Sequence, residues 1–146
     1  MTMASGLYVV TFRDALDTSD AVVNMLLNTN KVDLYLDAKT PDFDTDAAYD
    51  ATNEVDDAAP GYDRDTKTVG GTPTWALGNA GQLKYDWSTT VDWTSATFTA
   101  RGMIIHTAAD NFPIVAVTFG ADFTATNGTF SVDAHANGIF TIDLVP

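Results

Sequence analysis

Three aspartates at alternate positions, Asp42, Asp44 and Asp46, form the pattern in this chain that comes nearest to a metal-binding motif. The calcium-binding loops of EF-hand proteins begin with carboxylates at alternate positions, whose oxygens converge on one ion. The register then departs from that motif, because Ala47 stands where the turn requires glycine and Asn53 where the last acidic ligand belongs. We therefore interpret the aspartates as a solvated acidic loop, with a nonstandard calcium site as the alternative.

The chain has two histidines, His106 and His135, and both are predicted to lie near the ends of strands. A metal site built on both is one hypothesis, but such sites usually need a third ligand, and the chain has no cysteine to supply a thiolate. We interpret each histidine as a turn or rim residue. The sequence therefore predicts neither a bound metal nor a cofactor.

Motifs that activate a nucleophile or bind a phosphate are not recognisable in the sequence. There is no G-x-S-x-G elbow and no glycine-rich phosphate loop. Paired carboxylates can hydrolyse glycosides, but 20 acidic residues in 146 make accidental pairs common. We predict a protein that is not an enzyme and has no catalytic residues, and a small hydrolase is a distant alternative.

Aromatic residues gather in the middle third of the chain. Trp75, Trp87, Tyr85 and Tyr62 are the candidates for an interface with another protein, because tryptophan and tyrosine are common anchors of such surfaces. Core packing is the competing interpretation, and it suits Trp93 in a predicted strand best. A surface that stacks against sugar rings is the third possibility, which keeps a carbohydrate-binding module open.

The net charge of the chain excludes several classes of partner. Its 20 acidic residues, of which Glu54 is the only glutamate, outnumber 7 basic ones and leave a formal charge of -13. Such a surface repels phosphates, so we expect no nucleic-acid partner and no contact with an anionic membrane. The same charge costs stability through self-repulsion that salt screens, which suits a salty environment.

Alternation of apolar and polar residues predicts that the chain is mainly β. We expect strands near 31–36, 100–106, 112–119, 129–134 and 138–144, with a bulge or turn at Thr94-Ser95 where the alternation changes parity. The segment 112–119 is apolar on both faces, as in a central strand. Asn127-Gly128 and Asn137-Gly138 predict tight turns, and with them a C-terminal antiparallel meander.

The remaining segments complete the predicted architecture. Tyr8, Phe12, Ala15 and Leu16 recur at helical spacing, a second short apolar segment follows at 21–27, and the stretch 37–71 has the composition of long acidic loops. We therefore expect one β-rich domain over residues 1–146. Its fold class is an antiparallel β-sandwich or partly open barrel with a short N-terminal helix.

The order of several short segments resembles that of a group of small virion proteins of tailed viruses, from bacteriophages or haloarchaeal viruses. The segments are YVVTFRDAL at 8–16, KVDLYL at 31–36, TPDFD at 40–44, NEV at 53–55, GY at 61–62, VDWTSATFTARGMII at 91–105 and GIFTIDL at 138–144. This resemblance implies a non-enzymatic structural role in a virion, on the exterior of the head.

The resemblance and the charge lead to one functional expectation. We expect a capsid decoration or cement protein that binds the major capsid protein or other virion proteins as a homo-oligomer, with a trimer favoured because such proteins commonly lie on local three-fold axes. An acidic protein suits the outside of a particle better than the DNA-filled inside. The aspartate excess also suggests a virus of a salt-loving host, with an acidic protein of an actinobacterial phage as the competing origin. A tail, collar or fibre component is the alternative within the virion, and a carbohydrate-binding module is the alternative outside it.

Overall fold

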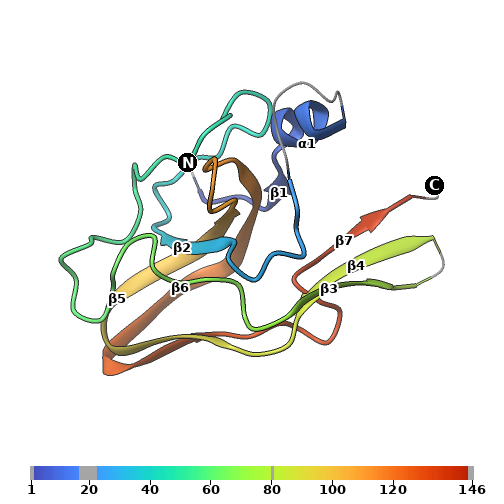
Figure 1. Ribbon diagram of the computed structural model, residues 1–146. Helices are drawn as coiled ribbons and strands as arrows, with labels where there is room; N and C mark the ends of the chain where they lie inside the picture. Colours follow the sequence, from blue (N-terminus) through green and yellow to red (C-terminus); the bar gives the residue numbers. More distant parts are fainter. Residues whose placement is uncertain (1, 17–22, 80, 145–146) are drawn as a thin grey trace.

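The computed structural model describes residues 2–16, 23–79 and 81–144. These residues form a mainly β structure with two antiparallel sheets and one short helix (Figure 1). A four-stranded sheet has the order β1-β6-β5-β2, and a three-stranded sheet has the order β3-β4-β7. The elements are β1 (Gly6–Leu7), α1 (Val9–Leu16), β2 (Lys31–Tyr35), β3 (Pro73–Leu77), β4 (Gln82–Trp87), β5 (Val91–His106), β6 (Pro113–Val132) and β7 (Phe140–Asp143). The predicted fold class, a β-sandwich or partly open barrel with a short N-terminal helix, is confirmed.

A long ribbon made of β5 and β6 forms the centre of the fold. The two strands pair from Val91↔Val132 to His106↔Pro113, and their register shifts between Trp93 and Ala96. Figure 1 shows the ribbon folding back on itself at the lower left, so that its two arms lie in different layers. Ser95 has a φ of 54° at this bend, which confirms the predicted irregularity at Thr94-Ser95.

Asn127-Gly128 does not form the predicted hairpin turn. Both residues lie inside β6, which runs without a break from Pro113 to Val132 and so joins most of the segments 112–119 and 129–134 that we expected to be separate strands. Asn127 has a φ of 48°, and Gly128 pairs with Ala96 on the neighbouring strand. The left-handed conformation that Asn-Gly favours therefore bends a strand here and does not end one.

The C-terminal strand is also arranged differently from the prediction. A tight turn does form at Asn137-Gly138, where the Gly138 amide donates a hydrogen bond of 2.7 Å to the His135 carbonyl. The chain then crosses to the other sheet, and β7 pairs with β4 through Lys84↔Thr141 and Tyr85↔Phe140. The predicted meander of consecutive C-terminal strands is therefore wrong.

Both faces of β2 are buried, although its sequence alternates. Val32 and Leu34 face the main core, and Asp33 and Tyr35 face the opposite side, yet all four are at most 1% exposed. The outer face is covered by the acidic segment 37–71, which contains no helix or strand, as expected, and touches β2 through the isolated bridge Tyr35↔Glu54. The four-stranded sheet is thus packed on its second face by a loop layer.

Helix α1 begins at the predicted place and packs against the same sheet. The Phe12 amide donates to the Tyr8 carbonyl at 3.1 Å, and the Thr11 hydroxyl donates to the Pro113 carbonyl at 2.6 Å. Of the second apolar segment, residues 23–27 form no helix or strand and contain a turn at 25–26, and the rest lies outside the described residues. In the described part of the chain, no helix has the length and apolar character needed to cross a membrane.

Candidate functional site

The outer face of β2 and β5 brings three ionisable side chains together beneath the loop layer. Asp33 lies in the middle of β2, His106 is the last residue of β5, and Asp65 belongs to the covering loop. The two strand residues are 1% and 0% exposed, whereas the side chain of Asp65 is 52% exposed. We call this group the Asp33–Asp65–His106 cluster. Asp33 and His106 are buried in it, and the Asp65 side chain is open to solvent.

The hydrogen bonds of His106 fix the orientation of its ring. Nδ1 lies 3.1 Å from the Thr107 carbonyl oxygen, and Nε2 lies 2.8 Å from Oδ2 of Asp33. Tyr49 stacks on the ring with centroids 4.6 Å apart. Because both nitrogens face oxygen acceptors, the imidazole satisfies both neighbours only when a proton or a metal ion lies between Nε2 and Asp33.

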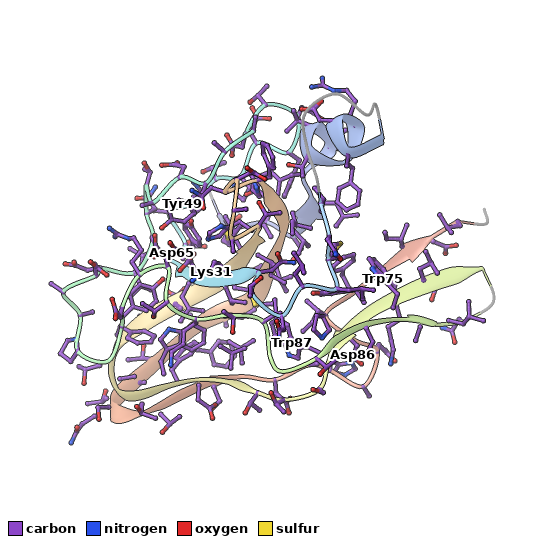
Figure 2. The ribbon with its side chains drawn as sticks, viewed as in Figure 1. Lys31, Tyr49, Asp65, Trp75, Asp86 and Trp87 are labelled. Atoms are coloured by element: carbon purple, nitrogen blue, oxygen red, sulfur yellow. The ribbon has the colours of Figure 1, made fainter. Side chains whose placement is uncertain are left out.

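Asp65 is positioned by backbone contacts between its loop and β2. Its amide donates a 3.0 Å hydrogen bond to Oδ1 of Asp33, and its carbonyl accepts one of 2.7 Å from Lys31. Its own Oδ1 lies 3.7 Å from Nε2 of His106. Figure 2 shows Lys31, Tyr49 and Asp65 on the side of the molecule where the loop crosses the sheet.

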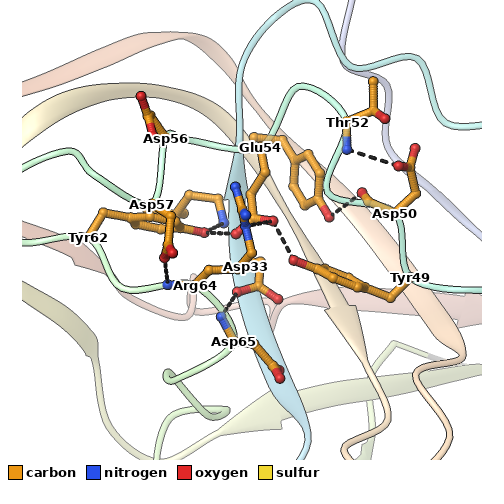
Figure 3. Close-up of polar contacts among 12 residues, drawn as sticks. Asp33, Tyr49, Asp50, Thr52, Glu54, Asp56, Asp57, Tyr62, Arg64 and Asp65 are labelled. Atoms are coloured by element: carbon orange, nitrogen blue, oxygen red, sulfur yellow. Dashed lines mark hydrogen bonds and ion pairs between the residues drawn. The ribbon is translucent and has the colours of Figure 1, made fainter.

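A second polar cluster is centred on Glu54, whose side chain is fully buried. Its carboxylate accepts hydrogen bonds from the hydroxyls of Tyr49 and Tyr62 and from Nε of Arg64, the last at 2.9 Å (Figure 3). Burial raises the pKa of Glu54 above its ordinary value, and the two tyrosine hydrogen bonds oppose that shift. Every donor comes from the segment 37–71, so the only glutamate ties this segment together.

Burial raises the pKa of the tyrosines that surround these clusters, Tyr35, Tyr49 and Tyr62. Their hydroxyls therefore stay protonated and act as hydrogen-bond donors. Tyr35 donates to the Asp50 carbonyl at 2.9 Å, and the Asp50 carboxylate pairs with Lys39 at 2.7 Å. These contacts hold the loop layer against the sheet, which is a structural role.

The three aspartates singled out in the sequence do not converge on one point. Oδ1 of Asp42 accepts from the amides of Asp44 and Thr45, and Oδ2 of Asp46 accepts from the amide of Asp42. The carboxylates of Asp42 and Asp46 thus cap the turns of their own loop, and the hydrogen bond with the Thr45 side chain is the main cause that lowers the pKa of Asp42. This arrangement agrees with the interpretation of a solvated acidic loop.

Three of the four interface candidates lie inside the protein. Tyr62, Tyr85 and Trp87 are at most 5% exposed and belong to the main core, where Trp93 lies as expected. The prediction that these three residues lie at an interface is therefore wrong, and they are core residues. Trp75 is only partly buried, and it packs against Tyr85 with ring centroids 5.2 Å apart. Sequence alone could not separate these roles, because core and interface favour the same aromatic residues.

An apolar groove of about 700 Å³ runs along β6. Its wall includes Met103, Val117, Phe119, Phe123 and Phe130, and Phe123 is 52% exposed. In the residues that the structure describes, β5 is the one strand that pairs with the stretch 123–132 of β6, so the other edge of this stretch is open.

The three-stranded sheet carries an apolar face that becomes exposed towards its free end. Two cross-strand rows lie on this face, and they consist of Trp75, Tyr85 and Phe140 in one row and Leu77, Leu83 and Ile142 in the other. The first row packs on the core, and Leu77 in the second row is 86% exposed. Leu144, which continues the same face, is 64% exposed. Figure 1 shows this sheet projecting from the body of the molecule.

The sequence interpretation missed Asp33 and Asp65 and placed His106 incorrectly. His106 does end a strand, but it is fully buried and not a rim residue, whereas His135 lies exposed in a turn, where its Nδ1 accepts from the Asn137 amide at 3.2 Å. The two histidines do not share the metal-ligand cluster found among the described residues. One usable signal was the charge of Asp33 between Val32 and Leu34 in the middle of a predicted strand, because a strand acid needs a buried partner when its face is covered.

Comparison with known proteins gives no relative from which a function can be carried over: no protein-family model, no curated protein and no solved structure matches this chain.

Proposed function

We propose that this chain is a non-enzymatic structural protein of a tailed-virus virion, and specifically a decoration protein that binds the outside of the capsid. The observation that carries the proposal is the apolar face at the end of the three-stranded sheet, where Leu77 and Leu144 are exposed and Leu83 and Ile142 are half-buried. An exposed row of aliphatic side chains is costly in water, and such surfaces usually mark contacts between proteins.

The chemistry of this face favours a protein partner over a sugar. Sugar-binding surfaces present flat aromatic rings, but the most exposed residues here are leucines, and Trp87 and Trp93 are buried. The neighbouring charged residues Lys84, Asp86 and Asp143 alternate with the apolar ones and therefore lie on the opposite face of the sheet. Although the chain as a whole is strongly acidic, this face therefore presents no charged side chain to a partner.

The distribution of charge supports an exterior location. A chain with a net charge of -13 is repelled by packaged DNA, and part of its acidic segment 37–71, including Phe43 and Tyr49, packs on the face of the four-stranded sheet opposite the main core. We propose that the apolar end of the three-stranded sheet faces the coat protein and the acidic layer faces solvent. The segments that resemble virion proteins include β2, β5 and β7, so the resemblance covers elements of both sheets.

We further propose that three copies assemble around local three-fold positions of the coat shell. Each copy brings the same large negative charge, so association should need either the coat surface or high salt to offset the repulsion. Native mass spectrometry at low and high salt tests this part. A mass near three times 15.6 kDa at high salt, and of one chain at low salt, is the expected result.

The location in the virion can be tested by quantitative proteomics of purified particles. A copy number near that of the major coat protein is expected for a decoration protein. A handful of copies per particle would support a tail, collar or fibre component instead, and absence from particles would refute a virion role.

The docking face can be tested by adding purified protein to particles from which it has been stripped. Leu77→Asp should abolish rebinding, because it places a charge in the apolar contact. Ala76→Asp is the matched control, because Ala76 is exposed on the opposite face of the same strand. Equal rebinding by both variants would show that this face does not bind the coat.

A further inference from the structure

The Asp33–Asp65–His106 cluster has the composition and geometry of a metal site, and we propose that it binds a divalent transition-metal ion such as Zn²⁺. One imidazole and two carboxylates form a mixed nitrogen and oxygen donor set, which suits Zn²⁺ better than the all-oxygen sites preferred by Ca²⁺ and Mg²⁺. One ligand atom from each residue lies within 4.8 Å of the others.

The distances between the ligand atoms fit a small ion. Ligands held about 2.0–2.1 Å from Zn²⁺ at tetrahedral angles are about 3.3 Å apart. Nε2 of His106 lies 2.8 Å from Asp33 and 3.7 Å from Asp65, so the two spacings bracket that value. The ligand atoms of Asp33 and Asp65 lie within 4.8 Å of each other, so a movement of the exposed Asp65 side chain towards Asp33 would seat the ion, with a fourth position left for water.

The contact of His106 with Thr107 is the second observation that points to a metal. Metal-binding histidines usually donate their other ring N–H to a carbonyl or carboxylate, which turns the free lone pair towards the ion. Here Nδ1 faces the Thr107 carbonyl at 3.1 Å, so the lone pair of Nε2 is directed at the two aspartates. The buried ring is further fixed by stacking on Tyr49.

The site is also accessible to an ion from solvent, and its ligands are held in place by neighbouring groups. Asp65 is half exposed, which gives an ion a path from solvent, while Asp33 is held by the Asp65 amide at 3.0 Å. The three ligands belong to β2, β5 and the covering loop. A bound ion would therefore join the acidic loop layer to the four-stranded sheet and stabilise the folded chain in proportion to its affinity and concentration.

The test is calorimetric titration of Zn²⁺ into chelator-treated protein, with thermal melts in parallel. We expect one ion per chain and a rise in melting temperature that millimolar Ca²⁺ or Mg²⁺ does not reproduce. Asp65→Asn should weaken Zn²⁺ binding by at least about tenfold, because a ligand matters at least as much as the groups that orient it. Asp65 is exposed, so this variant should keep the fold.

Two control variants separate this site from other surface sites. Asp63→Asn removes the same charge from an exposed position in the same loop and should leave binding unchanged. His135→Ala removes the other histidine and should also leave it unchanged. No binding by the wild type, equal binding by the Asp65→Asn and Asp63→Asn variants, or loss of binding in His135→Ala would each overturn the proposal.

Discussion

Nε2 of His106 lies 2.8 Å from Oδ2 of Asp33, although 73 residues separate them in the chain. Both side chains are almost fully buried, and they join two neighbouring strands on the face that the acidic loop covers. A buried polar pair of this kind is satisfied only as a unit, because removing one member leaves the other without its partner.

Removing one member of this pair should destabilise the protein. Asp33→Ala is expected to lower the free energy of unfolding by about 3 kcal/mol, which is typical when one partner of a buried pair is lost. Urea denaturation of the metal-free protein measures the change, and Asp44→Ala in the exposed loop is the control, with an effect below about 0.5 kcal/mol. A similar loss in both variants would show that the buried pair is not special.

Glu54 should make the protein less stable as the pH rises. Burial raises its pKa in the folded state above the ordinary value of 4.5, so the folded chain holds this proton more tightly than the unfolded chain does. The resulting stabilisation is fully present below about pH 4.5 and is lost as the pH rises through the raised pKa. The difference in unfolding free energy between wild type and Glu54→Gln should therefore shift against the wild type with rising pH.

Asp50 should have the opposite effect on the pH dependence of stability. Its hydrogen bond with Lys39 lowers its pKa from 3.8 to about 2, so its stabilisation is present above pH 3.8 and is lost as the pH falls towards 2. Asp50→Asn should therefore match the wild type at low pH and be less stable near neutrality. A pH profile that is the same for both variants would contradict these assignments.

Gly61 and Gly120 allow the cost of a backbone conformation to be separated from the cost of a collision. Both have a positive φ, of 79° and 81°. A Cβ at Gly61 would lie 2.5 Å from the Thr94 carbonyl oxygen, whereas a Cβ at Gly120 meets nothing within 4 Å. Gly120→Ala should cost about 1 kcal/mol, from the left-handed conformation alone.

Gly61→Ala should cost more, about 3 kcal/mol, because it also pushes the loop away from the bend at Thr94–Ala96. Chemical denaturation of the two variants measures the difference. Equal losses would mean that the loop can move away from the ribbon without penalty.

Monovalent salt should stabilise the isolated protein. The Debye length falls from about 10 Å at 0.1 M to about 3 Å at 1 M, which screens most of the repulsion among the excess negative charges. The melting temperature should rise with potassium chloride into the molar range, by several degrees if screening restores about 1 kcal/mol. A flat profile would refute the electrostatic explanation.

Calcium tests the acidic loop within the same experiment. Asp42, Asp44 and Asp46 use their side chains to cap local turns or point to solvent, so millimolar calcium should add little to the effect of salt. A large rise specific to calcium would restore the calcium-site interpretation that we set aside.

The parts of the fold that could be predicted are those in which the local pattern decides the outcome. The alternation at 31–36 and the apolar run at 112–119 correspond to strands, because burial of alternate or of all side chains leaves a period in the sequence. The irregularity at Ser95 was visible for the same reason. These features depend on neighbours in the chain.

The parts that could not be predicted depend on residues far apart in the chain. Asn127-Gly128 favours a left-handed conformation both in a turn and in a bent strand, and only the pairing with Ala96 decides between them. Asp33 would be a solvent-facing strand residue if the loop did not cover it, so its role depends on Asp65 and His106. Long-range contacts of this kind leave no periodic pattern in the sequence from which they could be predicted.

The connectivity of the two sheets also sets an order in which the chain can assemble. The β5–β6 ribbon can close outward from the turn at 107–112, so its first contacts require little loss of chain entropy. The three-stranded sheet is complete only when β7 reaches β4, where Gln82 meets Asp143 across 61 residues. The ribbon should therefore form early and the last strand dock late. Until it docks, the apolar face that we propose for coat binding stays incomplete, so a chain becomes competent to bind only at the final step of folding.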